Sequence, residues 1–337
     1  MTKIVISGYY GFKNFGDETI LSILTKHLKI LNTDITVFSS DTQFTKNTYN
    51  VHSVYTFDIK QVINTIKESD ILISGGGSLL QDVTGFKSLL YYAFVIFVAL
   101  IFKKKVIIFA QGIGPLKRNL SQIIVKNLLK KCSYISVRDE KSLNLLKAWN
   151  INADLVNDPV FSLNIEHKPA VKAVGIQLRE FKNVNDKFLN SLAQFVNAKF
   201  SDYKIEIFSL QNKYDLDISK TFESILKKVN QNIKTEIISD NIIENISQLE
   251  YLFAMRFHAI LIAIKAGIKT CAINYDIKVE QLADNAGIPI INPNENQNFE
   301  TIFNELTNLN SSELINFSNE KTFDWTKIDM SVNHPVS

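Results

Sequence analysis

An arginine, a histidine and a lysine lie at spacings that can form an anion site. The segment 251–267 (YLFAMRFHAILIAIKAG) predicts a short apolar strand, then Arg256 and His258, then an apolar helix that stops at Gly267. The first N–H groups of such a helix are unpaired and its dipole favours negative charge, so the two side chains can hold a phosphate or a carboxylate there. On this segment alone, a strand–helix junction with two solvated polar residues explains the pattern equally well.

Three further cations follow predicted strands. Lys278 comes after the next strand, twenty residues beyond His258. Ends of neighbouring parallel strands lie side by side, so we expect Lys278 at the same sheet edge and assign Arg256, His258 and Lys278 as catalytic. Arg138 in SVRDEKS and Arg179 in QLRE are predicted to clamp a substrate carboxylate. The alternative for Arg138 is an ion pair with neighbouring Asp139 or Glu140.

The first glycine-rich loop, GYYGFKNFGDE at 8–18, suits a sugar better than a nucleotide. It lacks the GxGxxG pattern and places Asp17 and Glu18 at the start of a predicted helix, where they would repel a phosphate. We therefore predict that Gly16, Asp17 and Glu18 bind sugar hydroxyls, with a carboxylate as acceptor or base. Stabilisation of the helix start alone is an equally weighted alternative.

A second glycine-rich loop, SGGGSLLQD at 74–82, allows a ligand to approach the backbone closely. Gly76, Gly77 and Gln81 are its predicted substrate-binding residues, and Gln111 before Gly112 is a fourth. A tight turn that serves packing only is the alternative.

Several classes of function are disfavoured. The chain has no HExxH motif, Cys pair or carboxylate triplet, so we expect no metal and no cofactor. It also lacks a P-loop and a G-x-S-x-G elbow. A net charge of +3 over 337 residues argues against binding nucleic acid. Two separated cysteines, Cys132 and Cys271, and no apparent signal peptide favour a cytoplasmic protein.

One apolar run resembles a membrane segment. The run 89–102 (LLYYAFVIFVALIF) is shorter than the roughly 20 residues that a spanning helix needs, and three lysines follow it. A buried helix is the favoured interpretation, and a peripheral contact with the inner face of the membrane stays open.

Strands alternate with helices over the first 160 residues and again from about residue 173, and a polar stretch at 164–172 separates the two patterns. This alternation predicts an α/β fold with two Rossmann-like domains facing a central cleft, as in GT-B enzymes. The expected domains are 1–165 and 166–322, followed by a tail at 323–337. Phe323 and Trp325 in that tail are suited to packing back on the body, and the last eight residues are expected to be loose.

Six motifs in order resemble the polysaccharide pyruvyl transferase family, most closely its CsaB-type members. The resemblance implies transfer of the enolpyruvyl group of phosphoenolpyruvate to two hydroxyls of a sugar, forming a pyruvate ketal and releasing phosphate. The family's Arg-x-His is matched by Arg256 and His258, its later lysine by Lys278, and its R-D-E arginine by Arg138. The sequence departs from the family at 12–15 and 249–251. The motifs are SGYYGFKNFGDETIL at 7–21, SGGGSLLQD at 74–82, AQGIGP at 110–115, SVRDEKS at 136–142, AMRFHAI at 254–260 and NYDIKV at 274–279.

The resemblance also implies the partners. Phosphoenolpyruvate is the expected donor substrate, bound by the C-terminal domain. The expected acceptor is a lipid-linked or polymeric sugar, N-acetylmannosamine of a cell-wall polymer that anchors S-layer proteins, bound by the N-terminal domain. His258 is then the acid or the group that stabilises departing phosphate, whose charge Arg256 and Lys278 offset. A nucleotide-sugar glycosyltransferase of the same fold is the second hypothesis, and a carbohydrate-binding protein with a disused site is the third.

Overall fold

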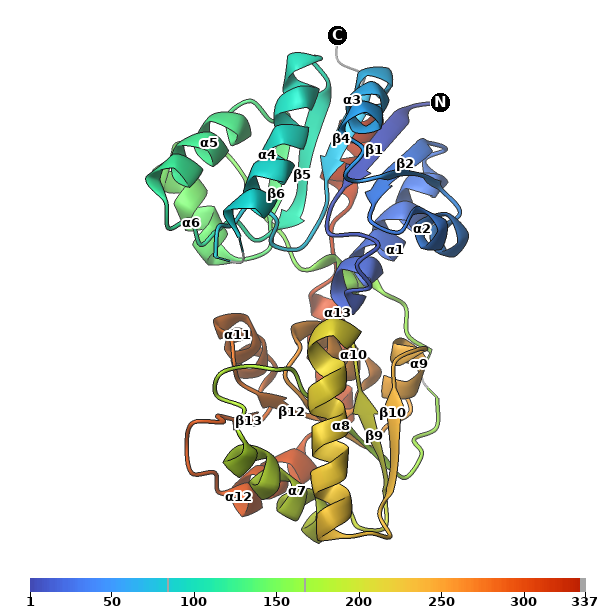
Figure 1. Cartoon of the computed structure of the whole chain (residues 1–337), viewed down its shortest axis with the longest axis vertical. Coiled ribbons are helices and arrows are strands. Elements are labelled where there is room, and N and C mark those ends of the chain that lie inside the picture. Colours follow the sequence, from blue (N-terminus) through green and yellow to red (C-terminus); the bar gives the residue numbers. More distant parts are fainter. Residues whose placement is uncertain (84, 167, 334–337) are drawn as a thin grey trace. The chain divides into compact units, whose positions relative to one another are not determined.

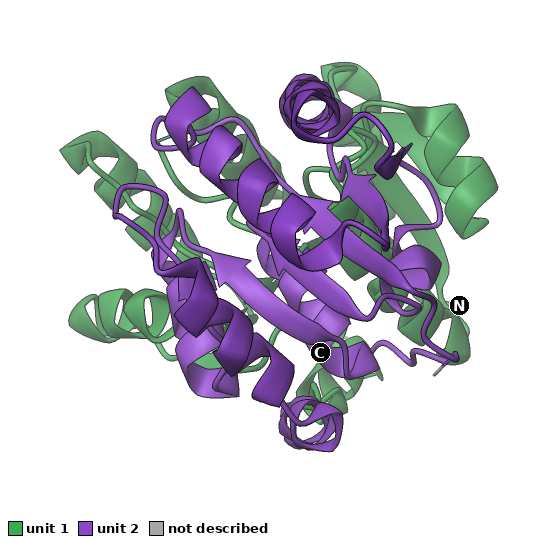
Figure 2. Cartoon of the chain, turned by 90° about the horizontal axis from the view of Figure 1, so that it is seen from below, with its two compact units in different colours: residues 1–162, 322–337 green, residues 163–321 purple. Residues whose placement is uncertain are grey.

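The chain forms two compact units in a computed structural model that describes residues 1–83, 85–166 and 168–333. Unit 1 comprises Met1–Ser162 together with the C-terminal segment from Thr322, and unit 2 comprises Leu163–Lys321 (Figures 1 and 2). The expected first domain, 1–165, ended three residues later than the first part of unit 1 does, and residues 323–337 were expected to form a separate tail. The structure instead assigns the described part of that tail to unit 1.

Unit 1 is built on a seven-stranded parallel sheet with the order β3-β2-β1-β4-β5-β6-β7. The strand order reverses between β1 and β4, and the carboxyl ends of two such strands are where open α/β sheets bind ligands. The strands are β1 Lys3–Ser7, β2 Asp34–Ser39, β3 His52–Tyr55, β4 Ile71–Ser74, β5 Lys105–Gln111, β6 Tyr134–Val137 and β7 Asp154–Leu155. The helices are α1 Phe15–Ile30, α2 Thr42–Tyr49, α3 Ile59–Glu68, α4 Phe86–Ile101, α5 Asn119–Leu129, α6 Glu140–Ala148, the short η1 Pro159–Ser162, and α14 Thr326–Asn333.

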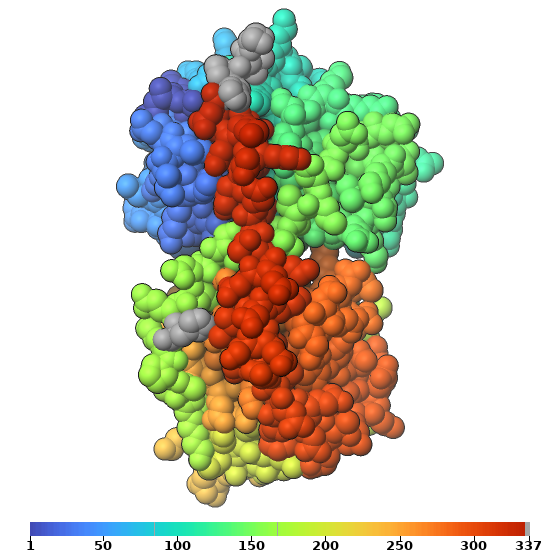
Figure 3. All heavy atoms as spheres, turned by 180° about the vertical axis from the view of Figure 1, so that it is seen from behind, coloured from blue at the N-terminus to red at the C-terminus, as the bar shows by residue number. Residues whose placement is uncertain are grey.

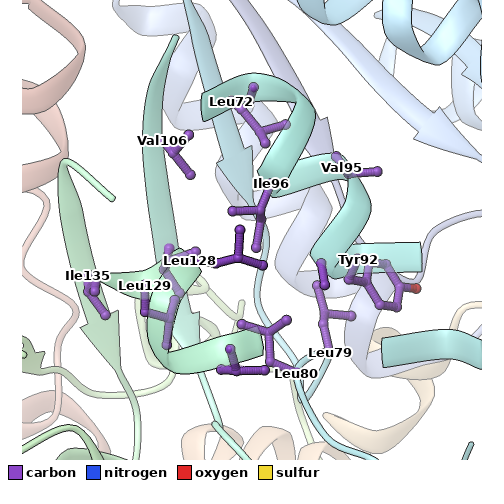
Figure 4. Close-up of a cluster of buried hydrophobic side chains, with 14 of the residues drawn as sticks. Leu72, Leu79, Leu80, Tyr92, Val95, Ile96, Val106, Leu128, Leu129 and Ile135 are labelled. Atoms are coloured by element: carbon purple, nitrogen blue, oxygen red, sulfur yellow. The ribbon is translucent and has the colours of Figure 1, made fainter. Parts of the chain in front are cut away.

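The apolar run at 89–102 forms most of α4, which covers the sheet of unit 1. Tyr92, Val95 and Ile96 of this helix belong to a buried core that also contains Val106 of β5 and Leu128 of α5 (Figure 4). The central strands are buried on both faces, as parallel strands covered by helices usually are. The expected buried helix is therefore present, although one face of it is exposed. Among the described residues, no helix is long and apolar enough to cross a membrane.

The C-terminal segment packs against unit 1. Trp325 stacks on His27 of α1 with ring centroids 3.9 Å apart, and His27 Nε2 lies 2.6 Å from Asp329 Oδ1 of α14. Phe323 and Trp325 both contact Phe109 of β5. Figure 3 shows this segment in red between the blue and green residues of unit 1. The expected packing of Phe323 and Trp325 is confirmed. The expected looseness is wrong for residues 330–333, which are helical, and residues 334–337 lie outside the described residues.

Unit 2 has a six-stranded parallel sheet with the order β10-β9-β8-β11-β12-β13. Its strand order reverses between β8 and β11, which pair directly. The strands are β8 Ala173–Gln177, β9 Lys204–Phe208, β10 Lys234–Ile238, β11 Tyr251–Ala254, β12 Lys269–Ile273 and β13 Ile290–Ile291. The helices are α7 Asp186–Phe200, α8 Asn212–Val229, α9 Ile242–Ile246, α10 Phe257–Ala266, α11 Ile277–Ala286, α12 Phe299–Asn308 and α13 Ser311–Glu320.

Candidate functional site

The carboxyl edge of the unit 2 sheet collects four of the predicted site residues. Strands β8, β11 and β12 are adjacent and parallel. Arg179 follows β8, Arg256 and His258 follow β11, and Lys278 lies in the first turn of α11 after β12. Helices α10 and α11, each of ten residues, both begin at this edge, so their positive dipole ends add to the charge of the side chains.

Arg256 is held by a buried carboxylate that the sequence analysis did not identify. Its Nε and Nη2 donate to the two oxygens of Asp215 at 2.7 and 2.6 Å, and Nη2 also lies 3.4 Å from Gln211 Oε1. The Asp215 side chain is fully buried and that of Arg256 is 11% exposed. This two-point contact fixes the guanidinium plane and leaves Nη1 outside it. Arg256 is therefore not the solvated junction residue of the alternative interpretation.

Gln177 ties the same junction to the end of β8. This residue is fully buried, and its Oε1 accepts the backbone N–H of Arg256 at 2.7 Å and that of Met255 at 3.2 Å. Its Nε2 donates to the carbonyl of Leu178 at 2.8 Å and lies 3.4 Å from Asp215 Oδ2. Gln177, Asp215 and Arg256 thus form one network that sets where α10 begins.

His258 and Lys278 occupy matching positions on neighbouring helices. His258 is the second residue of α10, half-buried, with its ring edge-on to Phe257 at a centroid distance of 5.2 Å. Lys278 is the second residue of α11, and its backbone N–H donates to the capping carboxylate of Asp276 at 3.0 Å. Each residue therefore lies in a first helical turn, where an anion is favoured.

Arg179 lies between two tyrosine rings. Its guanidinium carbon is 5.3 Å from the ring centroid of Tyr275 and 5.8 Å from that of Tyr214, and Nη1 lies 3.4 Å from the Tyr275 hydroxyl. Its backbone N–H contacts the sulfur of Met255 at 3.2 Å. The Nε atom is buried and has no hydrogen-bond partner among the described residues. Aromatic faces hold a guanidinium in place without consuming all its donors, which suits a carboxylate ligand.

Both carboxylate oxygens of Glu18 in unit 1 accept hydrogen bonds from neighbouring residues of the same unit. Its Oε1 accepts the Gly11 N–H at 2.8 Å and its Oε2 accepts the Tyr49 hydroxyl at 2.7 Å, and the residue is buried. Burial raises the pKa of this carboxyl above its usual value, against the opposing effect of the Tyr49 hydrogen bond. The expectation that Glu18 contacts a sugar hydroxyl is at odds with this geometry, because both oxygens are engaged inside unit 1.

Asp17 lies instead against the second glycine-rich loop. A Cβ added at Gly77 would be 2.6 Å from Asp17 Oδ1, and Gly77 has a φ of +94°, which side-chain-bearing residues rarely adopt. At Gly76 an added Cβ would be 2.8 Å from Ile20 Cγ2 of α1. Gly16, buried in the first turn of α1, donates its N–H to Asn14 Oδ1 at 3.1 Å. The two loops are therefore in close contact, with the Asp17 carboxylate at their junction.

Gln111 and Gln81 shape the same loop. The Gln111 side chain is fully buried, and its Nε2 donates to Ser74 Oγ at 2.7 Å and to the Gly75 carbonyl at 2.8 Å. Gln81 Oε1 accepts the Val83 N–H at 2.8 Å. Gln111 thus stabilises the start of the second glycine-rich loop through two hydrogen bonds. Its Oε1 is buried and has no hydrogen-bond partner among the described residues.

Arg138 forms an ion pair, although not with the predicted neighbours. Its Nη1 lies 2.7 Å from Asp158 Oδ2, and the two side chains are 12% and 3% exposed. Asp139 instead caps α6 by accepting the Ser142 N–H at 2.8 Å. Arg138 is thus held by a buried carboxylate, as Arg256 is.

No group of three or more His, Cys, Asp or Glu side chains within residues 1–83, 85–166 and 168–333 is arranged to hold a metal ion. Cys132 and Cys271 are both free thiols, and burial raises the pKa of Cys132 to about 12.

Comparisons with known proteins agree with this architecture. A sequence profile described as polysaccharide pyruvyl transferase matches residues 14–277. A search of curated protein sequences found no match. Among solved structures, HepE of Anabaena in complex with UDP-glucose has a TM-score of 0.67 at 13% identity, covering 98% of both chains.

Two further structures are similar in the same way. UDP-GlcNAc 2-epimerase of Methanocaldococcus jannaschii has a TM-score of 0.65 at 13% identity over 96% of this chain and 95% of that one. MurG of Acinetobacter baumannii has a TM-score of 0.59 at 10% identity over 98% and 99%. At these identities the likeness concerns the fold alone, which is that of GT-B enzymes.

Proposed function

The chain belongs to the polysaccharide pyruvyl transferase family, and we propose that it transfers the enolpyruvyl group of phosphoenolpyruvate to two hydroxyls of one sugar. The observation that carries this proposal is the fixed guanidinium of Arg256 at the start of α10. It lies on the same sheet edge as Arg179, His258 and Lys278. A donor with a carboxylate and a phosphate needs such a set of cations.

The chemistry proceeds by addition and displacement. A proton adds to the methylene carbon of phosphoenolpyruvate, which makes C2 electrophilic, and the first sugar hydroxyl bonds to C2 and loses its proton. The second hydroxyl then bonds to C2 while the C2–O bond to phosphate breaks, and its proton passes to the departing phosphate, which closes the ketal and releases inorganic phosphate. His258 supplies the acid or stabilises the departing phosphate, and Arg256 and Lys278 offset its charge. Arg179 binds the carboxylate.

Asp17 is the proposed acceptor-side carboxylate. It lies at the junction of the two glycine-rich loops of unit 1, whereas Glu18 is engaged by Gly11 and Tyr49. The proposed acceptor is N-acetylmannosamine of a lipid-linked cell-wall polymer precursor, which would serve S-layer anchoring. The two buried or half-buried free thiols support a cytoplasmic site of action.

A nucleotide-sugar glycosyltransferase is the second proposed function. It is favoured by the likeness to a fold relative whose structure contains UDP-glucose. The same helix start at α10 would then bind a diphosphate.

The decisive experiment offers both donors to the purified protein. Phosphoenolpyruvate or a panel of nucleotide sugars is mixed with lipid-diphosphate-linked disaccharides, and phosphate release and product mass are followed. We expect phosphate release only with phosphoenolpyruvate, and a product with an acid-labile ketal. Consumption of a nucleotide sugar instead would overturn the proposal in favour of the second function.

A matched pair of histidine variants tests the assignment of the acid. His258→Ala is expected to abolish phosphate release, whereas His52→Ala changes a histidine whose side chain is 76% exposed in β3 and should leave it unchanged. Near-normal turnover of the first variant would contradict the role of His258.

A further inference from the structure

Helices α4 and α5 of unit 1 enclose an apolar groove on its surface. The groove, here called the α4–α5 groove, has a volume of about 850 Å³. The two helices pack side by side over the sheet, with their inner faces in the core (Figures 1 and 4). Apolar side chains of both helices line it, namely Leu90, Phe94, Phe97, Leu100, Ile101 and Ile124.

The outer faces of these helices expose large apolar side chains. Phe97 and Ile101 of α4 are 52% and 57% exposed, and Leu120 and Ile123 of α5 are 55% and 56% exposed. Such a concentration on two neighbouring helices marks an interaction surface rather than the scattered apolar residues of an ordinary surface.

Lysines border one end of the groove. Lys103, Lys104 and Lys105 follow α4, and Lys131 follows α5. The surrounding segment 83–131 contains nine Lys or Arg residues and no Asp or Glu, which gives it a formal charge of +9 in a chain whose total is only +3. The positive charge of the protein is thus concentrated on the segment that carries the apolar groove.

We propose that the α4–α5 groove and its lysines bind the surface of an anionic lipid bilayer. An apolar face that enters the headgroup region and a cluster of lysines that contacts anionic lipids are the two signals that stable peripheral binding requires. Apart from the lysines, only Asn127 and Ser133 of the groove lining are polar, so the surface offers few directional contacts to a protein partner. A second copy of the same surface would meet it with like charge.

The experiment is flotation of the full chain with vesicles. Vesicles of phosphatidylglycerol and phosphatidylcholine are compared with vesicles of phosphatidylcholine alone, at low and at high salt. We expect binding only to the anionic vesicles, weakened by salt. The variant Lys104→Gln/Lys131→Gln is expected to lower partitioning roughly five-fold for each lysine removed, and Phe97→Ser/Ile101→Ser should lower it at least as much.

Control variants carry equivalent changes elsewhere. Lys220→Gln/Lys228→Gln alters two exposed lysines of α8, and Ile30→Ser alters an aliphatic side chain that is 80% exposed at the end of α1. These variants should partition like the unaltered chain. The proposal is overturned by equal binding to uncharged vesicles, by unchanged partitioning of the groove variants, or by a dimer in sedimentation that Phe97→Ser/Ile101→Ser dissolves. Phosphate release with a water-soluble acceptor is a separate readout and should be the same in all variants, so the failure of either proposal can be recognised by itself.

Discussion

Asp215 and Arg256 are joined by two parallel charge-assisted hydrogen bonds of 2.7 and 2.6 Å, across 41 residues of sequence. Asp215 also accepts the backbone N–H groups of Leu210 and Gln211 at 3.0 and 3.1 Å, so its carboxylate is fixed from several directions. The orientation of Arg256 is therefore set by the start of α8 as much as by its own helix.

Asp215 is expected to act as a positioning residue. Asp215→Asn keeps the size of the side chain but removes the charge that aligns the guanidinium, and we expect kcat/KM for phosphoenolpyruvate to fall about 100-fold. Steady-state kinetics and donor binding by calorimetry measure the effect. Asp217→Asn changes an exposed carboxylate two residues away on the same helix and should be silent. Equal kinetics of the two variants would exclude a role for Asp215 in positioning Arg256.

Arg179 is expected to recognise the donor carboxylate. Arg179→Lys keeps the charge but loses the planar group that lies between Tyr214 and Tyr275, so the KM for phosphoenolpyruvate should rise about ten-fold with a smaller change in kcat. The control is Arg118→Lys in unit 1, whose side chain is 55% exposed. An unchanged KM in the first variant would contradict the assignment.

Glu18 is expected to make stability depend on pH. Burial raises the pKa of this carboxyl above 4.5, so its contribution is complete below pH 4.5 and is lost as the pH rises through the higher folded-state pKa. Glu18→Gln does not titrate, and its amide has one more N–H than the protonated carboxyl has O–H groups, which is left unsatisfied in a buried site at a cost of about 1–2 kcal/mol at low pH. The difference in Tm between the two proteins should shrink from pH 4 to pH 8.

The neighbours of Glu18 are Tyr49, which donates to it, and Asp41, whose charge also raises the pKa of Glu18. Glu68→Gln alters an exposed carboxylate at the end of α3 and serves as the control. A difference in Tm that grows with pH would refute the direction of the shift.

Gly77 is expected to matter for the acceptor beyond its backbone conformation. Gly77→Ala places a methyl group at a φ of +94° and pushes Asp17 away, whereas Gly287→Ala has a φ of +64° with nothing within 4 Å. Both should lose about 1–2 kcal/mol of unfolding free energy from the backbone conformation. Only Gly77→Ala should also weaken acceptor turnover, measured as phosphate release at saturating donor. Equal turnover of the two variants would exclude a role for the loop junction.

The periodic segments of the fold could be predicted from the sequence because burial imposes a pattern on them. Strands such as β1 and β4 have almost no exposed residue, so each forms a short apolar run that can be recognised in the sequence. Helix α2 and strand β3 show no such pattern, because α2 buries only Thr45 and Tyr49 and β3 is an edge strand with partly exposed residues. Helix α13 shows no clear pattern for the same reason, since it buries only Leu314 and Ser318.

The site could be predicted only where its residues follow strands. Arg256 and Lys278 were assigned to one sheet edge because the alternation of strands and helices implies it. Asp215 could not be paired with Arg256, because no local pattern connects two residues on elements so far apart in sequence. The contacts of Glu18 with Gly11 and Tyr49 could not be predicted either, because both partners lie in segments without a recognisable period.

The return of the C-terminal segment to unit 1 has a consequence for synthesis of the protein. A ribosome completes residues 163–321, which form unit 2, before it makes Trp325 and Asp329, the partners of His27. Unit 1 is therefore the first unit to be synthesised and the last to be completed. Until Trp325 is made, Phe109 and His27 lack the aromatic ring that packs on them. Truncation after Lys321 would leave the sequence of unit 2 intact and remove the segment that packs on unit 1.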